Sequence, residues 1–275
     1  ITDVVRNGQP VSGIAFNSIG RFAQGGLLRE RFFPRLMAAP AETLLKTDSS
    51  GFDPAKVLAL VMANEKPGGH GDRAAAVGGL ELAFWDLNSK LAGEPAYRQI
   101  AASYGNNTVG ETVPVYAAGG YYHPQKRLNG LVDELKGYQD LGFQDFKIKI
   151  GGASLSEDIK RLEAAIKIAG SSHRIAVDAN GRFDLETAQN YARELAEYEL
   201  RWFEEPGDPL DFELNRHISK AYVGPIATGE NLFSTVDTLN LVRYGGMRTD
   251  KDIFQMDPGL SYGLTEFARM LGVIE

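Results

Sequence analysis

The second half of the chain repeats one pattern, a short apolar run followed by a segment with helical spacing. Apolar runs begin near residues 113, 145, 174, 201, 225 and 252. The segments between them carry apolar residues three or four apart, as in Ile159, Leu162 and Ile166, which is typical of a helix with one buried face. Alternating strands and helices predict a parallel sheet with helical crossovers. We therefore expect an α/β fold, a (β/α) TIM-type barrel with six of its eight units present.

The chain has fewer β/α units than a closed barrel needs. A closed barrel of this kind has eight strands, and each unit here spans about 27 residues, so two more units need roughly fifty residues beyond Glu275. An open barrel would expose long parallel edges. We accordingly expect the sequence to be a fragment that lacks residues at both ends.

Residues 1–110 lack the repeat and instead show a strand ribbon followed by helices. This pattern predicts an α+β capping domain ahead of a barrel domain over residues 111–275. The β-rich runs Ile1–Val5 and Val11–Phe16 flank a turn and predict a hairpin. A two-stranded ribbon is marginal alone, so we expect another strand upstream of residue 1 or from elsewhere. Capping and spacing signals predict a glycine-rich loop over Lys66–Arg73 and helices over Leu27–Met37 (with Pro34 as an interruption), Asp53–Met62, Ala74–Leu91 and Tyr97–Ser103.

Polar residues stand at or just after the apolar runs, at intervals of about 27 residues: Lys149, Asp178, Glu204, Glu230 and Asp257. The carboxyl ends of parallel barrel strands converge on one face, where active sites are built. Three carboxylates placed together repel one another unless a cation lies between them. The pattern predicts a divalent metal ion held by Asp178, Glu204 and Glu230, although the sequence leaves open whether Glu204 or Glu205 points inward. Each acid taken alone is also compatible with an ordinary surface turn.

Lys147 and Lys149 are two residues apart, so their side chains share one face of the predicted strand. If Ile148 and Ile150 pack under the helices, both lysines point into the barrel. There a lysine beside a metal ion and a second cation would have a lowered pKa, as a general base requires. The alternative is a pair of solvent-facing lysines on an edge strand.

The amino-acid composition limits the ligands and partners that the protein can be expected to bind. The net charge of −7, without any Lys/Arg-rich run, argues against nucleic-acid binding. The chain has no cysteine and 4 histidines, so we expect oxygen ligands for the metal, which favours Mg²⁺ or Mn²⁺. No apolar run approaches the roughly 18 residues that a membrane helix needs, and no signal peptide is recognisable. We expect no membrane association and a cytoplasmic location.

The ordered motifs resemble the enolase superfamily, in particular its mandelate-racemase-type subgroup. The resemblance covers nearly the whole chain and rests on Lys-x-Lys at 147–149, Val-Asp-Ala-Asn at 177–180, Glu-Glu-Pro at 204–206, Gly-Glu-Asn at 229–231 and Gln-x-Asp at 255–257. Within that subgroup, residues 66–73, 116–122, 203–210, 243–247 and 261–266 resemble the D-tartrate dehydratases.

The resemblance implies a role for each motif. Asp178, Glu204 and Glu230 would bind Mg²⁺, Lys149 would remove the α-proton, and Lys147 would hold the substrate carboxylate. Asp257 would pair with a catalytic histidine on the next strand. The histidines of this chain are His70, His123, His173 and His217, and none follows Asp257.

The implied function is that of a carbon–oxygen lyase (hydro-lyase) that dehydrates a small hydroxy diacid, D-tartrate to oxaloacetate. The further candidates for substrate binding are Asn180, Lys66, His70, Tyr121 and Tyr122. Another acid-sugar dehydratase or a racemase on the same scaffold is an alternative, because fold and metal ligands do not decide the substrate. A Schiff-base aldolase that uses Lys149, or a noncatalytic relative, are alternatives of other classes. We also expect a homo-oligomer.

Overall fold

A computed structural model describes residues 1–17, 22–66, 70–105, 108–123 and 127–275, with the side chains of His70 and Arg127 outside the description. These residues form two compact units. The first unit comprises Ile1–Glu111, Glu230–Leu239 and Met256–Glu275, and the second comprises Thr112–Gly229 and Asn240–Gln255. The sequence-based division at residue 110 stays a prediction.

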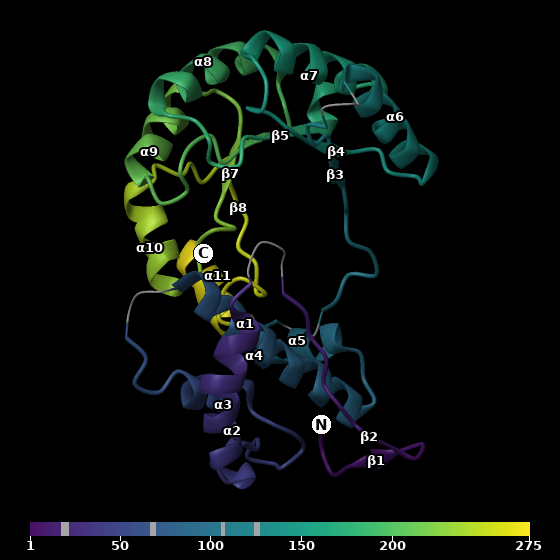
Figure 1. The fold of residues 1–275 in the computed structure, drawn as a ribbon, viewed down its shortest axis with the longest axis vertical. Helices are drawn as coiled ribbons and strands as arrows, with labels where there is room; N and C mark the ends of the chain where they lie inside the picture. Colours follow the sequence, from purple (N-terminus) through teal and green to yellow (C-terminus); the bar gives the residue numbers. More distant parts are fainter. Residues whose placement is uncertain (18–21, 67–69, 106–107, 124–126) are drawn as a thin grey trace. The chain divides into compact units, whose positions relative to one another are not determined.

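The second unit contains a six-stranded sheet in which all neighbouring strands are parallel. Along the sheet the order is β3 (Ala117–Gly119), β4 (Phe146–Lys149), β5 (Ile175–Asp178), β6 (Trp202–Glu204), β7 (Ile226–Thr228) and β8 (Ile253–Phe254). Helices α6 (Arg127–Asp140), α7 (Leu155–Ala169), α8 (Leu185–Leu195) and α9 (Phe212–Ala221) follow the strands in an arc on their outer side (Figure 1). The repeated β/α units of the predicted α/β fold are thus confirmed.

Alternation along the strands separates the two faces of this sheet. Phe146, Ile148 and Ile150 are buried in a large core that includes side chains of α6–α9. On the opposite face a small cluster contains Ala176, Trp202 and Ala227, with Tyr116 and Ile253 against it. The prediction that Ile148 and Ile150 pack under the helices is confirmed. Since successive side chains alternate, Lys147 and Lys149 lie on the face opposite the helices.

The helices begin and end where the sequence places their caps. Ser154 accepts a hydrogen bond from the N–H of Glu157 at the start of α7, and Gly170 ends that helix with a φ of 76°. Asp184 and Asp211 cap α8 and α9 in the same way. These caps fix where each strand-to-helix connection begins.

The first strand of the sheet does not lie where the apolar run predicts it. The run over 113–116 is outside the sheet, with Val113 and Val115 being 78% and 61% exposed, and pairing begins at Ala117, opposite Phe146. The prediction was wrong because the register with β4, rather than the number of apolar side chains, decides which residues enter the sheet.

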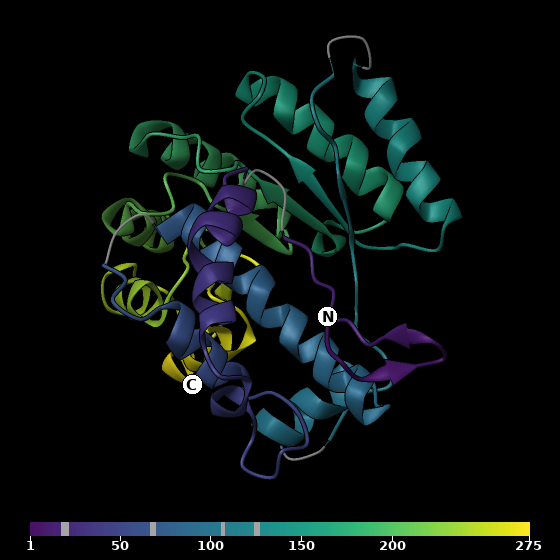
Figure 2. The same ribbon diagram turned by 60° about the horizontal axis from the view of Figure 1, so that its bottom comes forward.

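The first unit contains a short antiparallel hairpin and a group of helices (Figure 2). The hairpin pairs β1 (Val5–Arg6) with β2 (Gln9–Pro10), which confirms the predicted hairpin, although its strands are shorter than the runs predicted over 1–5 and 11–16. A larger set of helices follows, with a π-helical turn over Leu28–Phe32 and a 3₁₀ turn over Ala41–Leu44: α1 (Gln24–Leu27), α2 (Phe33–Ala38), α3 (Pro54–Val61), α4 (His70–Ala92), α5 (Ala96–Tyr104) and α11 (Leu264–Ile274).

Two local features of these helices differ from expectation. The predicted helix over 27–37 widens into the π-helical turn just before Pro34, whose ring nitrogen cannot donate to the preceding turn. Residues 70–73, predicted as loop, form the first turn of α4, while residues 67–69 lie outside the described part of the chain. Asp53 caps α3 as predicted.

Helix α4 is the central element of the first unit. Its small residues permit close packing, since a Cβ on Gly78 would lie 2.8 Å from the backbone oxygen of Ser261. Glu81 is fully buried on α4 and accepts hydrogen bonds from Trp85 Nε1 (3.0 Å) and from the N–H groups of Leu264 (2.8 Å) and Thr265 (3.1 Å). Burial raises the pKa of Glu81 despite these donors. The carboxyl group therefore joins α4 to the beginning of α11.

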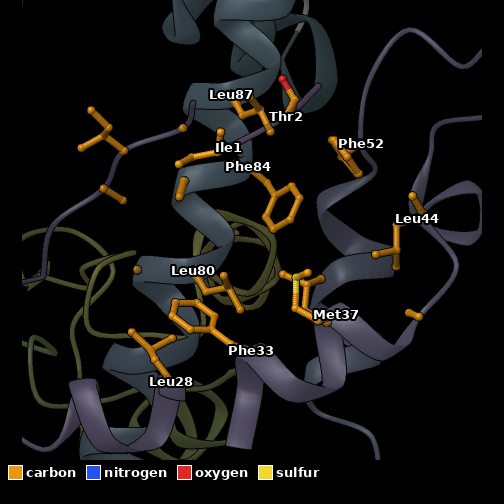
Figure 3. Close-up of a pocket in the computed structure, with 18 of the residues that line it drawn as sticks. Ile1, Thr2, Leu28, Phe33, Met37, Leu44, Phe52, Leu80, Phe84 and Leu87 are labelled. Carbon is orange, nitrogen blue, oxygen red and sulfur yellow. The ribbon is translucent and has the colours of Figure 1, made fainter. Parts of the chain in front are cut away.

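An apolar cavity of about 830 Å³ lies along α4 in the same unit (Figure 3). Leu80, Phe84 and Leu87 line it from α4, and Phe33 and Met37 line it from α2. The additional strand expected near the hairpin stays a prediction. No helix within the described ranges is long and apolar enough to cross a membrane.

Arg248 joins the beginnings of two strands of the second unit. Its guanidinium donates to Asp252 Oδ2 (2.9 Å) and Oδ1 (2.6 Å) and to the carbonyl oxygens of Tyr222 (2.6 Å) and Gly224 (2.7 Å). Asp252, whose side chain is 0% exposed, also accepts from the N–H of Ile226 (2.8 Å). This arrangement satisfies a buried carboxylate and holds β7 beside β8.

We predict that Arg248→Ala lowers the free energy of unfolding by about 3 kcal/mol, because it leaves the buried Asp252 carboxylate without its cation. Urea unfolding measures the difference. The matched control is Arg216→Ala, which removes an arginine from an exposed pair with Glu213 and should cost less than about 1 kcal/mol. Equal losses in the two variants would contradict the structural role assigned to Arg248.

Candidate active site

Two lysines and two carboxylates lie together on the face of the second unit's sheet that is opposite the helices. Lys147 Nζ is 2.5 Å from Glu204 Oε1 and 3.2 Å from Asp178 Oδ2. Lys149 Nζ is 2.5 Å from the same Asp178 oxygen. The lysine side chains are only 11% and 14% exposed, so the alternative of a solvent-facing pair is wrong.

Strand register brings these four side chains together. Lys149 is paired with Asp178 across β4 and β5, and Asp178 with Glu204 across β5 and β6. Each residue is the last of its strand. The prediction that polar residues at successive strand ends share one face is confirmed for these three strands.

The structure also shows which of the paired glutamates points toward the lysines. Glu204 has its side chain 1% exposed and directs Oε1 to Lys147. Glu205 follows with a φ of 39°, an unusual backbone conformation for a residue with a side chain. The N–H of Asn180, another residue with positive φ (50°), donates to Asp178 Oδ1 at 2.8 Å. Both strands thus end in constrained turns directly after the carboxylates.

The charged side chains of the cluster shift one another's pKa values. Burial alone would raise the pKa of Asp178, but Lys147 and Lys149 outweigh burial, so the pKa of Asp178 is lowered. Burial and the adjacent charge of Asp178 raise the pKa of Glu204, against the opposing effect of Lys147. Two neighbouring carboxylates therefore compete for the available positive charge.

Two carboxylates set the pKa of Lys147. Burial would lower the pKa of Lys147, but the nearby Glu204 and Asp178 carboxylates outweigh burial and raise it. The lowered pKa expected for a lysine beside a metal ion and a second cation stays a prediction, because the two carboxylates are the charges nearest to Lys147 here. Lys147 is a cation held in place, which suits binding of a negative group better than removal of a proton.

Of the further candidates in this unit, only Tyr121 has a contact with the lysines within the described residues. Lys149 Nζ lies 5.4 Å from the centre of the Tyr121 ring. Tyr122 instead donates to Asp158, and its ring lies 4.2 Å from the Arg161 guanidinium. Both tyrosines line a polar cavity of about 760 Å³. Asn180 has an exposed side chain.

Four of the predicted residues belong to the first unit, and their roles stay predictions. Glu230 stands two residues after the end of β7. Asp257 accepts from the N–H of Gly259 at 2.6 Å. Lys66 is exposed, with its backbone oxygen bound by Arg73, and the side chain of His70 lies outside the described residues.

The residues of the second unit have the donor chemistry of a hard-metal site. Asp178 and Glu204 supply carboxylate oxygens, the ligands that Mg²⁺ prefers. Burial and the charge of Asp178 raise the pKa of Glu204, and a cation beside the two carboxylates would offset their repulsion. Within the described ranges no group of three His, Asp or Glu side chains is close enough to hold a metal ion. The third predicted ligand, Glu230, is assigned to the first unit.

Sequence reasoning missed two residues that contact Glu204. Trp202 Nε1 donates to Glu204 Oε2 at 2.8 Å, and Gln255 Nε2 donates to the same oxygen at 3.0 Å. The signal was available for Trp202, which precedes Glu204 by two residues and therefore shares its face of the strand. Gln255 belongs to the Gln-x-Asp motif, but nothing in its local sequence indicates a contact across β7.

A family model described as enolase C-terminal domain-like matches residues 130–275, more than half of the chain. The chain belongs to this family, within the enolase superfamily. The superfamily expected from the ordered motifs is thereby confirmed, whereas the resemblance to D-tartrate dehydratases is not shown.

Curated relatives of this enolase-superfamily chain include sugar-acid dehydratases. Arabinonate dehydratase from Saccharolobus solfataricus is 32% identical over 203 residues, which are 74% of this chain and 52% of that protein. L-Talarate/galactarate dehydratase from Salmonella typhimurium is 29% identical over 233 residues, 84% of this chain and 55% of that protein. The chain thus spans about half the length of these relatives.

Solved structures of the superfamily share the fold. L-Talarate dehydratase from Polaromonas sp. JS666, complexed with Mg and L-glucarate, superposes with a TM-score of 0.78 at 27% identity, over 95% of this chain and 68% of that one. A racemase from Streptomyces coelicolor A3(2) with bound magnesium gives a TM-score of 0.73 at 26% identity, over 91% of this chain and 64% of that one.

We predict that Asp178→Asn lowers the free energy of unfolding of the metal-free protein by about 2–4 kcal/mol at pH 7, since it removes a buried carboxylate that two lysines contact. The folded-state pKa of Asp178 is lowered, so its contribution is present above the unfolded-state pKa of about 3.9. That contribution is lost as the pH falls through the folded-state value. Unfolding measured at several pH values should show the difference between the two proteins shrinking below about pH 4.

The control for this comparison is Asp184→Asn. Asp184 is an exposed helix cap, and Asn caps as well as Asp, so little change is expected at pH 7. A pH-independent difference between wild type and Asp178→Asn would show that the charge of Asp178 is not what stabilises the cluster.

Proposed function

We propose that the protein is a Mg²⁺-dependent hydro-lyase that converts a small hydroxy acid to a 2-keto acid. The supporting observation is the cluster of Lys147, Lys149, Asp178 and Glu204 at the ends of three adjacent strands. A site of this class needs a base beside the α-carbon and fixed positive charge where negative charge develops. The cluster contains both an amine and oxygen ligands for a cation.

The proposed metal ligands are Asp178, Glu204 and Glu230. The first two are adjacent in register, and Glu230 follows the next strand by two residues. Solved structures of superfamily members contain magnesium, in agreement with an all-oxygen ligand set. Bound Mg²⁺ would stabilise negative charge on the substrate carboxylate when the α-proton leaves.

Each lysine is assigned a role from its surroundings. Lys149 takes the α-proton onto Nζ, breaking the C–H bond, and Asp178 Oδ2 at 2.5 Å orients the ammonium group that results. Lys147, whose Nζ lies against Glu204 and Asp178, supplies the positive charge that binds the substrate carboxylate. As the C=C bond forms, the β-hydroxyl departs with a proton as water, and the enol product tautomerises to the keto acid. Tyr121 borders the base and contributes to substrate binding.

The finer proposal for the substrate is D-tartrate, which would give oxaloacetate. Its support is the resemblance of residues 66–73, 116–122 and 203–210 to tartrate dehydratases. A small dianionic substrate needs cationic side chains to bind its two carboxylates, and Lys147, Lys66 and His70 are the candidates. Asn180 and Tyr122 are candidates for further contacts with the substrate. Asp257 would position the acid that protonates the leaving hydroxyl. We also propose a homo-oligomer in the cytoplasm, on the expectation from sequence.

A panel of acids with Mg²⁺ tests the proposal through the formation of a 2-keto acid. The panel contains D-tartrate with arabinonate, galactarate and galactonate, the acids in the names of relatives. Turnover of D-tartrate above the sugar acids supports the finer proposal, and the reverse order corrects the substrate but keeps the reaction. Racemisation or α-proton exchange without dehydration of any of the acids would contradict the hydro-lyase assignment.

We predict that Lys149→Met lowers kcat by at least about 10³-fold, because the α-proton loses its acceptor. Binding of Mg²⁺, measured by calorimetry, should be retained. Lys220→Met, on the exposed side of α9, is the control and should leave both quantities unchanged. Turnover that survives in Lys149→Met would exclude this lysine as the base. Borohydride trapping of substrate on Lys149 would instead indicate Schiff-base chemistry.

A further inference from the structure

The two oxygens of Glu204 have different surroundings. Oε2 accepts two hydrogen bonds from neutral donors, Trp202 Nε1 at 2.8 Å and Gln255 Nε2 at 3.0 Å. Oε1 faces only the charged Lys147 Nζ among the hydrogen bonds in the described part of the chain, at 2.5 Å. Two donors on one oxygen fix the rotation of the carboxylate and leave the other oxygen directed to positive charge.

We propose that Trp202 and Gln255 are positioning residues that hold Glu204 Oε2 and thereby offer Oε1 to the metal ion. This inference rests on the proposed function, in which Glu204 is a ligand of Mg²⁺. A carboxylate free to rotate would lose rotational freedom when it binds the ion. One that is already held binds the ion at a smaller entropic cost.

Trp202 is itself firmly held. It is 5% exposed, its ring makes an edge-to-face contact with Tyr116 at 5.2 Å, and the Arg201 guanidinium lies 5.2 Å from its centre. A buried indole N–H needs an acceptor, and Glu204 provides it. Packing therefore determines the orientation of the ring, and the hydrogen bond from its N–H orients the Glu204 carboxylate.

Gln255 reaches Glu204 from the other side, from the end of β8. Its backbone N–H donates to the backbone oxygen of Thr228 at 2.9 Å, which fixes the position of the Gln255 backbone beside β7. Its Oε1 is buried and has no hydrogen-bond partner in the described part of the chain. A buried amide oxygen without a donor is costly, so the position suits a hydroxyl group or water that enters with the ligand. Gln255 would then contact both the metal ligand and the ligand's own polar atoms.

The chain offers a matched control for Trp202. It contains 2 tryptophans, and both donate an indole N–H to a buried glutamate. Trp85 Nε1 donates to Glu81 Oε1 at 3.0 Å, and the remaining donors to Glu81 in the described residues are the backbone N–H groups of Leu264 and Thr265 and the Thr265 hydroxyl. Trp85→Phe therefore removes the same kind of hydrogen bond from a carboxylate that is not a proposed metal ligand.

Binding of Mn²⁺ to the intact protein, followed by the EPR signal of the free ion, tests the inference without any turnover. Trp202→Phe keeps the aromatic ring and removes the donor, and Gln255→Leu removes the amide. We expect each to raise the Kd for Mn²⁺ by about 10- to 100-fold, as for other residues that orient metal ligands. Trp85→Phe should lower thermal stability but leave the Kd unchanged.

The affinities of the folded variants distinguish a positioning role from a purely structural one. Affinity within twofold of wild type in folded Trp202→Phe and Gln255→Leu would overturn the inference. If Trp202→Phe does not fold, Gln255→Leu alone decides. If wild type forms no keto acid from any acid but the variants still bind Mn²⁺ more weakly, the proposed reaction fails and the positioning role stands. Unchanged affinity in variants that still dehydrate a substrate would overturn the positioning role and leave the reaction standing.

Discussion

The second unit depends on neutralisation of four buried charges at the ends of three strands. Asp178 and Glu204 are almost inaccessible to water, and two neighbouring buried carboxylates are costly unless cations lie against them. Lys147 contacts both acids and Lys149 contacts one, so neither lysine can be removed without leaving negative charge uncompensated. The same requirement that makes the cluster costly to bury makes it suitable for a divalent cation and for an anionic substrate.

The sheet places this cluster through period-two alternation. Apolar residues such as Ile148 and Phe203 face the helices, and the intervening polar residues share the other face. The sequence was sufficient to predict that these polar side chains share one face, because alternation and equal spacing are visible in one chain. Motifs, rather than composition, were needed to reach the superfamily, to which the matched family model assigns the chain.

Features that depend on contacts between distant residues were not predictable in the same way. The start of the first strand at Ala117 follows from pairing with β4 and not from the apolar run before it. The raised pKa of Lys147 follows from distances to two acids on other strands. Gln255 reaches Glu204 across an intervening strand, which no local pattern encodes. Sequence therefore predicted which residues share a face, and only the structure showed which atoms meet.

The central claim is that Lys149 accepts the α-proton of a substrate whose carboxylate is bound by Mg²⁺. The most direct measurement is the release of deuterium from an acid labelled at the α-carbon, followed by NMR before and after removal of Mg²⁺ with a chelator. We predict that release requires both Mg²⁺ and Lys149 and is restored when Mg²⁺ is returned. Release at an undiminished rate in Lys149→Met, or in wild type after chelation, would contradict this claim.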